Sequence, residues 1–461
     1  MDKVIKIKRG LDIRIKGKVD TSLSAPTLFY EKYAVKPGDF YCLMPKMLVS
    51  VGDKVKAGTP LFCHKKDERI KVPSPVAGVI SDIIIGERRA VEAVLINADK
   101  EADYVNFEIP VALNEDSVRN TLLETGLWCM LRRRPYDTIP SPDDSPRDIF
   151  ISCFSSYPLA PDMEMLVHGR EKEFQMGIDV LKHLVSGKGN SVGKGGNIHL
   201  GLHVSHTTSY AFKECKNAEI HYFDGPHPSG NVGVQIHHIA PLNFGEQVWY
   251  IHPQDVVAIG NLFMTGKFDA TRIIAVAGSE VLRTRYVKTR LGVNVSYLLE
   301  NNLSDEEVRV ISGDIFTGKK INAKSTDGYV GFYDSLISVI PEGNRSRFLG
   351  WITPGINLYS FSHSFFSWLT LDREYKIDTN LNGGRRAYVL TGDFERVFPY
   401  DIYPLQLIKA CLAKDVEKML ALGIYEVAPE DFALCEYIDA SKTEIQQIIK
   451  EGLELVRKET E

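Results

Sequence analysis

Residues 51–85 read VGDKVKAGTPLFCHKKDERIKVPSPVAGVISDIII. Short β-forming runs alternate here and just upstream with turn signals: PGD at 37–39, VGD at 51–53 and AGT at 57–59. The glycines permit backbone turns that other residues would strain. The pattern predicts a β-rich N-terminal region over residues 1–100.

This region resembles a biotinyl or lipoyl domain, in which two β-hairpin halves close a flattened barrel and a carrier lysine lies at the tip of a tight turn. The resemblance implies a barrel-sandwich module within residues 1–100. VGDKVKAGTPL matches the segment before that turn and SPVAGVI the segment after it. Counting back from Pro75 and Gly78, the carrier position is Asp67, with Lys65 and Lys66 beside it. A slip of one residue at a strand end turns a side chain to the other face, so a lysine next to the carrier position would point the wrong way. The sequence therefore predicts a carrier fold without cargo; a biotin or lipoate carrier is the less favoured alternative.

The composition is that of an ordinary soluble protein, with 44% hydrophobic and 25% charged residues among 461. This length accommodates about two to four domains. The net charge of −5 and the pI near 6.2 argue against nucleic-acid binding, which calls for a basic excess. No apolar run approaches the ~18–20 residues that span a bilayer, and the charged N-terminus is unlike a signal peptide. We expect a cytosolic chain unless a partner holds it elsewhere.

The cysteines are widely scattered and form no CxxC pair. Zinc and iron–sulfur sites require closely spaced cysteines, so neither is predicted. We expect reduced and mostly buried thiols. The seven residues are Cys42, Cys63, Cys129, Cys153, Cys215, Cys411 and Cys435.

The pattern along the chain predicts a multidomain α+β protein. Residues 1–100 are β-rich, whereas in 101–256 strands such as IFISCF and NIHLGLHV alternate with helices such as EFQMGIDVLKHLV. This alternation predicts an open, Rossmann-like α/β sheet. Residues 257–326 form a compact α+β unit, and 327–461 begin with β-rich segments and end in helices.

Two motif hypotheses fail on spacing. SGKGNSVGKGGN at 186–197 has Lys188 and Gly195 where a phosphate loop needs Gly and Ser or Thr, and it follows a helix; we interpret it as a surface loop. Several histidines lie between residues 199 and 252, but His199 and His203 on one predicted strand are ~13 Å apart, too far for one ion. HExxH and GxSxG are absent. We therefore expect no metal ligands and no catalytic residues.

Two other stretches leave alternatives open. FDGPHPSGNVGVQIHH at 223–238 contains Gly225, His227, Pro228 and Gly230 after a strand, so it either turns a corner or admits a ligand to the backbone. GLWCMLRRRPYD at 126–137 sets arginines beside aromatic residues, as in a salt-bridged surface, a partner interface or a flat π-ligand site.

Taken in order, these stretches resemble the A subunit of the bacterial sodium-translocating NADH:quinone oxidoreductases. The matching motifs are the cargo-less barrel, ETGLW with RRRPY, FDGPHPSG, WYIHPQDVVAIGNLFMTG, EVRVISGDIFTG and EDFALCEY. The match covers essentially the whole chain, and FDGPHP with QDVVAIG is the specific part. The family is also similar to the C subunit of the ferredoxin:NAD oxidoreductase complex and to the flavoprotein subunit of complex I. By this similarity, residues 257–326 are expected to be a β-grasp unit of the soluble-ligand-binding (SLBB) type.

The resemblance also implies what the chain lacks. In the flavin-binding relatives a glycine-rich run cradles the flavin phosphate, whereas here the run after Gly126 is LWCMLRRRP. Trp128, Met130 and Leu131 would block that approach, so neither flavin nor NADH is expected to bind. The cysteine clusters of the ferredoxin-linked relative are missing, and LCEYIDASK at 434–442 has Asp439 in place of a second cysteine, which argues against a redox role for Cys435.

The resemblance implies a peripheral subunit on the cytoplasmic face of the bacterial inner membrane, without a transmembrane segment or catalysis of its own. The complex passes electrons from NADH to quinone and exports sodium. FMN, FAD, riboflavin and iron–sulfur centres belong to other subunits, which with quinone are the expected partners. A purely structural scaffold is the alternative. The candidate quinone contacts are Tyr30, Tyr33, Trp128, Arg134, Pro135 and Tyr136.

Overall fold

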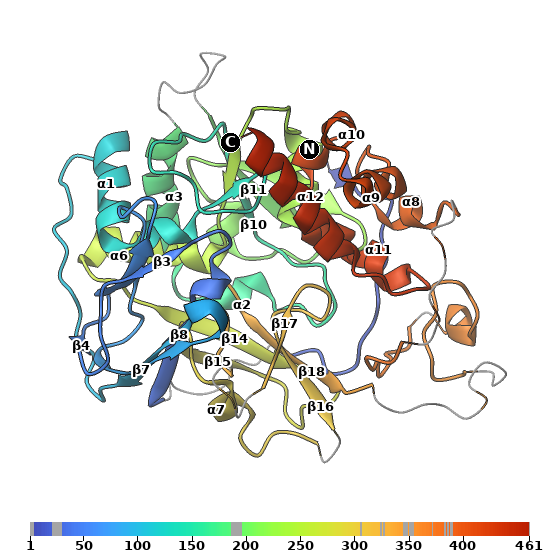
Figure 1. Cartoon of the computed structure of the whole chain (residues 1–461), viewed down its shortest axis with the longest axis horizontal. Helices are drawn as coiled ribbons and strands as arrows, with labels where there is room; N and C mark the ends of the chain where they lie inside the picture. The colour runs from blue at the N-terminus through green and yellow to red at the C-terminus, as the bar shows by residue number, and fades with distance from the viewer. Residues whose placement is uncertain are drawn as a thin grey trace.

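Figure 1 shows the computed structural model, in which a central α/β sheet lies between a β-rich region and a group of C-terminal helices. The described residues are 4–20, 30–185, 196–304, 307–322, 325, 328–343, 349, 355–370, 372–381, 384, 387 and 391–460. Residues 186–195 of the surface loop predicted at 186–197 lie outside the described residues. Among these residues, no helix is both long and apolar enough to span a bilayer.

The N-terminal region contains two small sheets that face each other. One has the order β2-β8-β7-β4 and the other β3-β5-β6, all antiparallel. Gly52 (φ 93°) and Gly58 (φ 97°) form turns in the left-handed region that favours glycine. The elements are β2 (Lys32–Val35), η1 (Pro37–Asp39), β3 (Pro45–Met47), β4 (Lys54–Val55), β5 (Pro60–His64), β6 (Lys71–Pro73), β7 (Gly78–Ile85), η2 (Glu87–Arg89) and β8 (Val91–Ala98).

The central sheet has the strand order β1-β12-β11-β10-β13-β9, and only β9 runs antiparallel to its neighbour. Its inner strands β10, β11 and β13 are buried almost throughout, as a sheet covered on both sides requires. The strands are β1 (Ile5–Lys6), β9 (Arg132–Arg134), β10 (Ile149–Ser152), β11 (Ile198–His203), β12 (Glu219–Asp224) and β13 (Val248–Tyr250).

Helices cover both faces of this sheet. On one face α3 and α6 pack closely against each other, and glycines at the contact make this possible. A side chain on Gly260 would collide with the Glu173 carbonyl, and a side chain on Gly177 would collide with the Val256 carbonyl. On the other face α5 packs on Phe150 of β10. The helices are α1 (Glu115–Thr125), η3 (Leu127–Met130), α2 (Met163–Val167), α3 (Glu171–Val185), α4 (Tyr210–Lys213), α5 (Val232–Ile239) and α6 (Pro253–Thr265).

When the two N-terminal sheets are counted together as one barrel, the third sheet of the molecule is five-stranded. It has the order β15-β14-β18-β16-β17 and lies below the central sheet in Figure 1. The expected domain boundary at 256/257 falls inside α6, and the one at 326/327 precedes β18, which pairs with both β14 and β16. The elements are β14 (Thr271–Ala277), β15 (Arg285–Arg290), α7 (Val295–Leu299), β16 (Val308–Ser312), β17 (Lys319–Ile321) and β18 (Leu336–Pro341).

The C-terminal helices form a separate core with the first strand of the chain. Ile7 and Phe223 of the central sheet edge belong to the same buried cluster as Phe398 and Ile449. All seven cysteines are free, and five are buried. The elements are η4 (Phe366–Leu369), α8 (Asp393–Val397), α9 (Pro404–Ala413), α10 (Val416–Ala421), η5 (Ile424–Glu426), η6 (Pro429–Phe432), α11 (Ala433–Ile438) and α12 (Ile445–Thr460).

Candidate functional site

A cavity of about 440 Å³ lies at the carboxyl ends of β10 and β13. From β10 the chain continues to β11 and β12 on one side, whereas β13 pairs with β10 on the other side. The cavity therefore lies at the switch point of the sheet, where open α/β sheets commonly bind ligands. Loops of the third sheet at 312–318 and 331–336, and residues 428–430 of the C-terminal region, close it.

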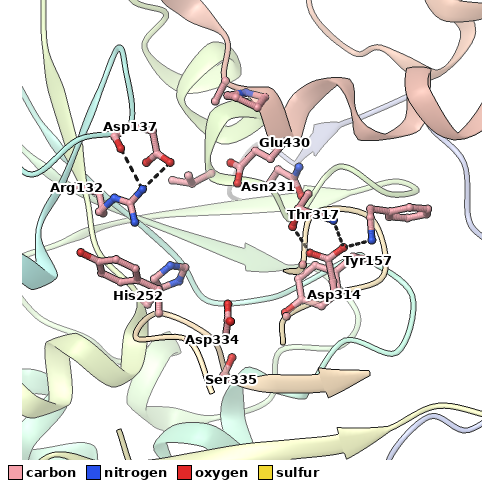
Figure 2. A pocket seen from close by; sticks show the side chains of 18 of the residues that line it. Arg132, Asp137, Tyr157, Asn231, His252, Asp314, Thr317, Asp334, Ser335 and Glu430 are labelled. Atoms are coloured by element: carbon pink, nitrogen blue, oxygen red, sulfur yellow. Dashed lines mark hydrogen bonds and ion pairs between the residues drawn. The ribbon is translucent and has the colours of Figure 1, made fainter. Parts of the chain in front are cut away.

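Aromatic side chains supply much of the apolar wall. Phe154 and Tyr157 follow β10, and Phe332 and Tyr333 come from the third sheet. Polar groups project between them; Figure 2 shows Asn231, His252, Asp314 and Glu430, among others, around one opening. The cavity therefore combines aromatic faces with polar groups, as small-molecule sites commonly do.

One wall is built on a buried arginine of β9. Arg132 donates to the carboxylate of Asp137 at 2.6 Å and to its carbonyl at 3.0 Å, and its guanidinium lies 4.4 Å from the centre of the Tyr333 ring. The Tyr250 hydroxyl also donates to Asp137. Burial alone would raise the pKa of Asp137, but the charges of Arg132 and Arg134 outweigh it, so that pKa lies below its usual value.

The neighbouring wall joins β9 to the C-terminal region. Arg134 donates to Glu430 at 2.6 Å and lies 5.1 Å from the centre of the Tyr250 ring. Burial is the main cause that raises the pKa of Glu430, to about 7; Arg134 opposes the rise and Asp431 adds to it. Near neutral pH this carboxyl group can therefore hold or release a proton.

Two further acidic groups line the side formed by the third sheet. Asp314 accepts hydrogen bonds from the backbone N–H of Phe316 at 2.7 Å and of Thr317 at 3.1 Å, and Asp334 accepts from the Ser312 hydroxyl at 2.5 Å. Burial raises the pKa of both aspartates. The cavity thus presents carboxyl groups with raised pKa values together with a charged arginine.

The structure separates the six candidate quinone contacts. Tyr136 lines the cavity. Arg134 and Pro135 precede it in the chain and are not among the residues that line the cavity; Arg134 is paired with Glu430. Trp128 is fully buried, and its indole N–H donates to the Pro140 carbonyl at 2.9 Å.

The two remaining candidates, Tyr30 and Tyr33, are buried in the main core and are not among the residues that line the cavity. Tyr30 stacks on Tyr297 of α7, with ring centres 5.3 Å apart. Of the whole set, Tyr136 alone lies on the cavity.

The FDGPHPSG stretch both turns a corner and reaches the cavity. At Gly225 (φ 144°) a side chain would collide with the Ile7 carbonyl, so this glycine allows β12 to pass close to the N-terminal strand. His227 and Gly230 line the cavity, and Pro228 lies between them. Nδ1 of the His227 imidazole shares a hydrogen bond of 3.0 Å with the Ser156 hydroxyl, and the ring stacks on the Phe316 ring. Burial lowers the pKa of His227 to about 3, so this ring is neutral.

Most polar residues of the cavity were not predicted from the sequence. Asp314 lies in the quoted GDIFTG motif and Glu430 begins EDFALCEY. Both stretches were recognised as family motifs, but no function was predicted for either residue. Asn231 lies in the quoted stretch at 223–238. Asp334 had no such signal, because isolated polar residues in loops are common. Only the tertiary fold brings these segments together.

At the tip of the barrel hairpin, an aspartate occupies the predicted carrier position. Asp67 lies between β5 and β6, where Arg69 donates to it at 2.7 Å and also to Asp143 at 2.7 Å. A carboxylate has no amine with which to form the amide that attaches biotin or lipoate. Lys65 and Lys66 next to it are exposed.

Three family models match the chain. An NqrA N-terminal barrel-sandwich hybrid domain matches residues 5–99, an NqrA second alpha/beta domain matches 113–268, and an NQRA C-terminal domain of the SLBB type matches 273–323. The predicted fold class, with a barrel-sandwich module, an α/β domain and an SLBB-like unit, is confirmed.

Full-length relatives give the same family. The chain is 35% identical over 464 residues to the A subunit of the Na(+)-translocating NADH-quinone reductase of Yersinia pestis bv. Antiqua (strain Angola), a match that covers 99% of this chain and 100% of the relative. The corresponding A subunit of Hahella chejuensis is 35% identical over 467 residues with the same coverage. A solved NAD+-reducing [NiFe]-hydrogenase in the air-oxidized state is 11% identical, covers 74% of this chain and 60% of its own, and has a TM-score of 0.37, too low to support an argument. The chain belongs to the NqrA family, the A subunits of the Na(+)-translocating NADH-quinone reductases.

Proposed function

We propose that this chain is a peripheral, cytoplasmic-side subunit of a complex that couples electron transfer from NADH to quinone with sodium export. Similarity to NqrA relatives over 99% of the chain supports this role. In this proposal the redox cofactors FMN, FAD, riboflavin and iron–sulfur are carried by other subunits. The chain itself contributes a quinone contact and does not catalyse a reaction in isolation.

The observation that carries the quinone contact is the cavity at the sheet switch point. Its volume of about 440 Å³ falls in the range of about 300–1,000 Å³ that small-molecule sites occupy. Tyr136, Phe154, Tyr157 and Tyr333 offer faces on which a quinone ring can stack. The opening is shared by several domains, so occupation of the cavity would also fix them relative to one another.

The polar groups of the cavity match the two carbonyl oxygens of a quinone. The Arg132 guanidinium is a permanent donor, and Glu430, whose pKa is raised to about 7, would supply an O–H donor when it is protonated. Two-electron reduction of a quinone takes up two protons, one at each oxygen. Carboxyl groups with raised pKa values can hold such protons near the ring without a net negative charge.

A first expected result concerns flavin. Leu127, Trp128, Cys129, Met130 and Leu131 are each 0% exposed, so their side chains fill the space beside the backbone that a flavin phosphate would need. The chain purified under native conditions should therefore have no flavin absorbance and no iron. A stoichiometric flavin spectrum that survives gel filtration would contradict this.

A second expected result tests the cavity directly. Ser335 projects into it in Figure 2, and a Ser335→Trp change places an indole in the space proposed for the quinone ring. Isothermal titration of the isolated chain with a water-soluble short-chain benzoquinone should show affinity reduced at least about tenfold, or about 1.4 kcal/mol. The matched control, Ser205→Trp at an exposed position, should bind like the wild type.

The outcomes separate the proposals. If the wild type binds the benzoquinone and Ser335→Trp does not, the cavity is the site. If Ser335→Trp binds as tightly as the wild type, the quinone lies elsewhere on the chain. If the wild type shows no saturable binding, the structural scaffold is the better description.

A further inference from the structure

At the amino ends of β11 and β12, opposite the edge that holds the cavity, three metal-ligating side chains converge. The Nδ1 atom of His199 lies 3.0 Å from Nε2 of His221 and 3.5 Å from Oε2 of Glu219. The third side of this triangle, from His221 Nε2 to Glu219 Oε2, is 3.8 Å. Two imidazole nitrogens and one carboxylate oxygen therefore face a common point.

The parallel register explains the convergence. His199 is paired with Glu219, and Gly201 is paired with His221, so the three side chains project from one face of two adjacent strands. The ~13 Å spacing that separates His199 from His203 along one strand does not limit neighbours on two strands.

The triangle has the dimensions of a zinc site. Tetrahedral Zn²⁺ with bonds of ~2.0–2.2 Å holds its ligand atoms ~3.3–3.6 Å apart, and the three distances here bracket that range. Three protein ligands with a fourth, solvent-side position are a known zinc arrangement. His199 is buried and Glu219 is exposed, so the site opens to solvent on the Glu219 side.

The surroundings orient both ends of the triangle. The other ring nitrogen of His199, Nε2, lies 3.6 Å from the Asp148 carboxylate, and the ring stacks on Phe150 at 4.7 Å. A carboxylate behind a histidine fixes the tautomer whose remaining nitrogen faces the metal. Asn197 donates to Oε1 of Glu219 at 2.8 Å, which leaves Oε2 directed at the two imidazoles.

We propose that His199, His221 and Glu219 bind one divalent transition-metal ion, Zn²⁺ in the first instance, which links β11 to β12 at this edge of the sheet. Asp148 is a positioning residue for His199. The site is independent of the proposed quinone cavity, because it lies at the opposite ends of the strands.

The test uses the full chain without a histidine tag, stripped with a chelator and titrated with Zn²⁺. We expect one ion per chain and a melting temperature that rises with zinc, since a ligand bound only by the folded state stabilises it. His221→Gln and Glu219→Gln should each weaken binding by more than about 100-fold, and Asp148→Asn by about 10–100-fold. Co²⁺ in place of Zn²⁺ should give the visible absorption of a tetrahedral site.

The control is His206→Gln, the same substitution at an exposed histidine of the same histidine-rich segment. It should bind zinc like the wild type. Saturable binding that His206→Gln abolishes, or that His221→Gln and Glu219→Gln both leave unchanged, overturns the proposal. Absence of stoichiometric binding in the wild type also overturns it and leaves a hydrogen bond between two histidines. Because Glu219 is exposed, its variant reports on binding even if a histidine variant folds poorly.

Discussion

Replacing Trp128 by alanine is expected to destabilise the chain by about 3–5 kcal/mol, the cost of removing a large buried aromatic side chain. Trp128 is 0% exposed, and its ring packs edge-on against Trp249 of β13 at 5.3 Å between centres. The change also leaves the Pro140 carbonyl without its indole donor. Urea unfolding measures the loss, and the melting temperature should fall by about 3–5 °C for a chain of 461 residues.

The matched control is Trp368→Ala, because Trp368 is 47% exposed. It should stay within about 0.5 kcal/mol of the wild type. Trp128→Phe, which retains a ring, should recover much of the lost stability. A Trp128→Ala chain as stable as the control would mean that the indole does not support the core. If Trp128→Ala is destabilised as expected, slow quinone reduction by this variant in the assembled complex reports a damaged fold and not a lost contact.

Local patterns were enough to predict the scaffold. The glycine turns of residues 51–85 define the barrel, and the helical spacing of Phe174, Ile178 and Leu181 predicts α3 within two residues of its start. These features depend on neighbours in the sequence. Turns and amphipathic helices can therefore be predicted without knowing which other segment of the chain packs against them.

The sites could not be predicted in the same way. For the arginines of β9 the sequence left a salt-bridged surface, a partner interface and a flat π-ligand site open. Their partners include Glu430, which follows almost three hundred residues later in the chain and reaches β9 only through the tertiary fold. Likewise, the convergence of His199 with His221 depends on the register of two parallel strands, and no pattern within either strand encodes that register. Charges and ligands that meet across elements require the fold itself.

Replacing Arg134 by methionine is the other change with a large expected effect. The Arg134 side chain is 4% exposed and pairs with Glu430 at 2.6 Å. Methionine keeps a stem of similar length but leaves the Glu430 carboxylate without its cation. Breaking a buried pair from one side costs about 3–5 kcal/mol, and we expect about 3 kcal/mol because the Glu430 side chain is 35% exposed and can reach water.

This loss should depend on pH. In the wild type the pKa of Glu430 is raised to about 7 by burial, above the value of an unfolded chain. A raised folded-state pKa contributes stability that is fully present below the unfolded value and is lost as pH rises through the folded value. Without Arg134 the pKa of Glu430 rises further, since Arg134 opposes the shift. The deficit of Arg134→Met should therefore be largest at about pH 8.5 and smaller at about pH 5.5, where the carboxyl group is neutral.

Two comparisons decide between charge and packing as the cause. The double variant Arg134→Met with Glu430→Gln removes both charges and should recover most of the stability lost at about pH 8.5. Arg14→Met breaks the ion pair between Arg14, whose side chain is 55% exposed, and Asp372, whose side chain is 95% exposed. This change should cost about 0.5 kcal/mol or less at either pH. If Arg134→Met loses the same stability at both pH values and Glu430→Gln restores none of it, Arg134 acts through its packing on Tyr250 and not through its charge.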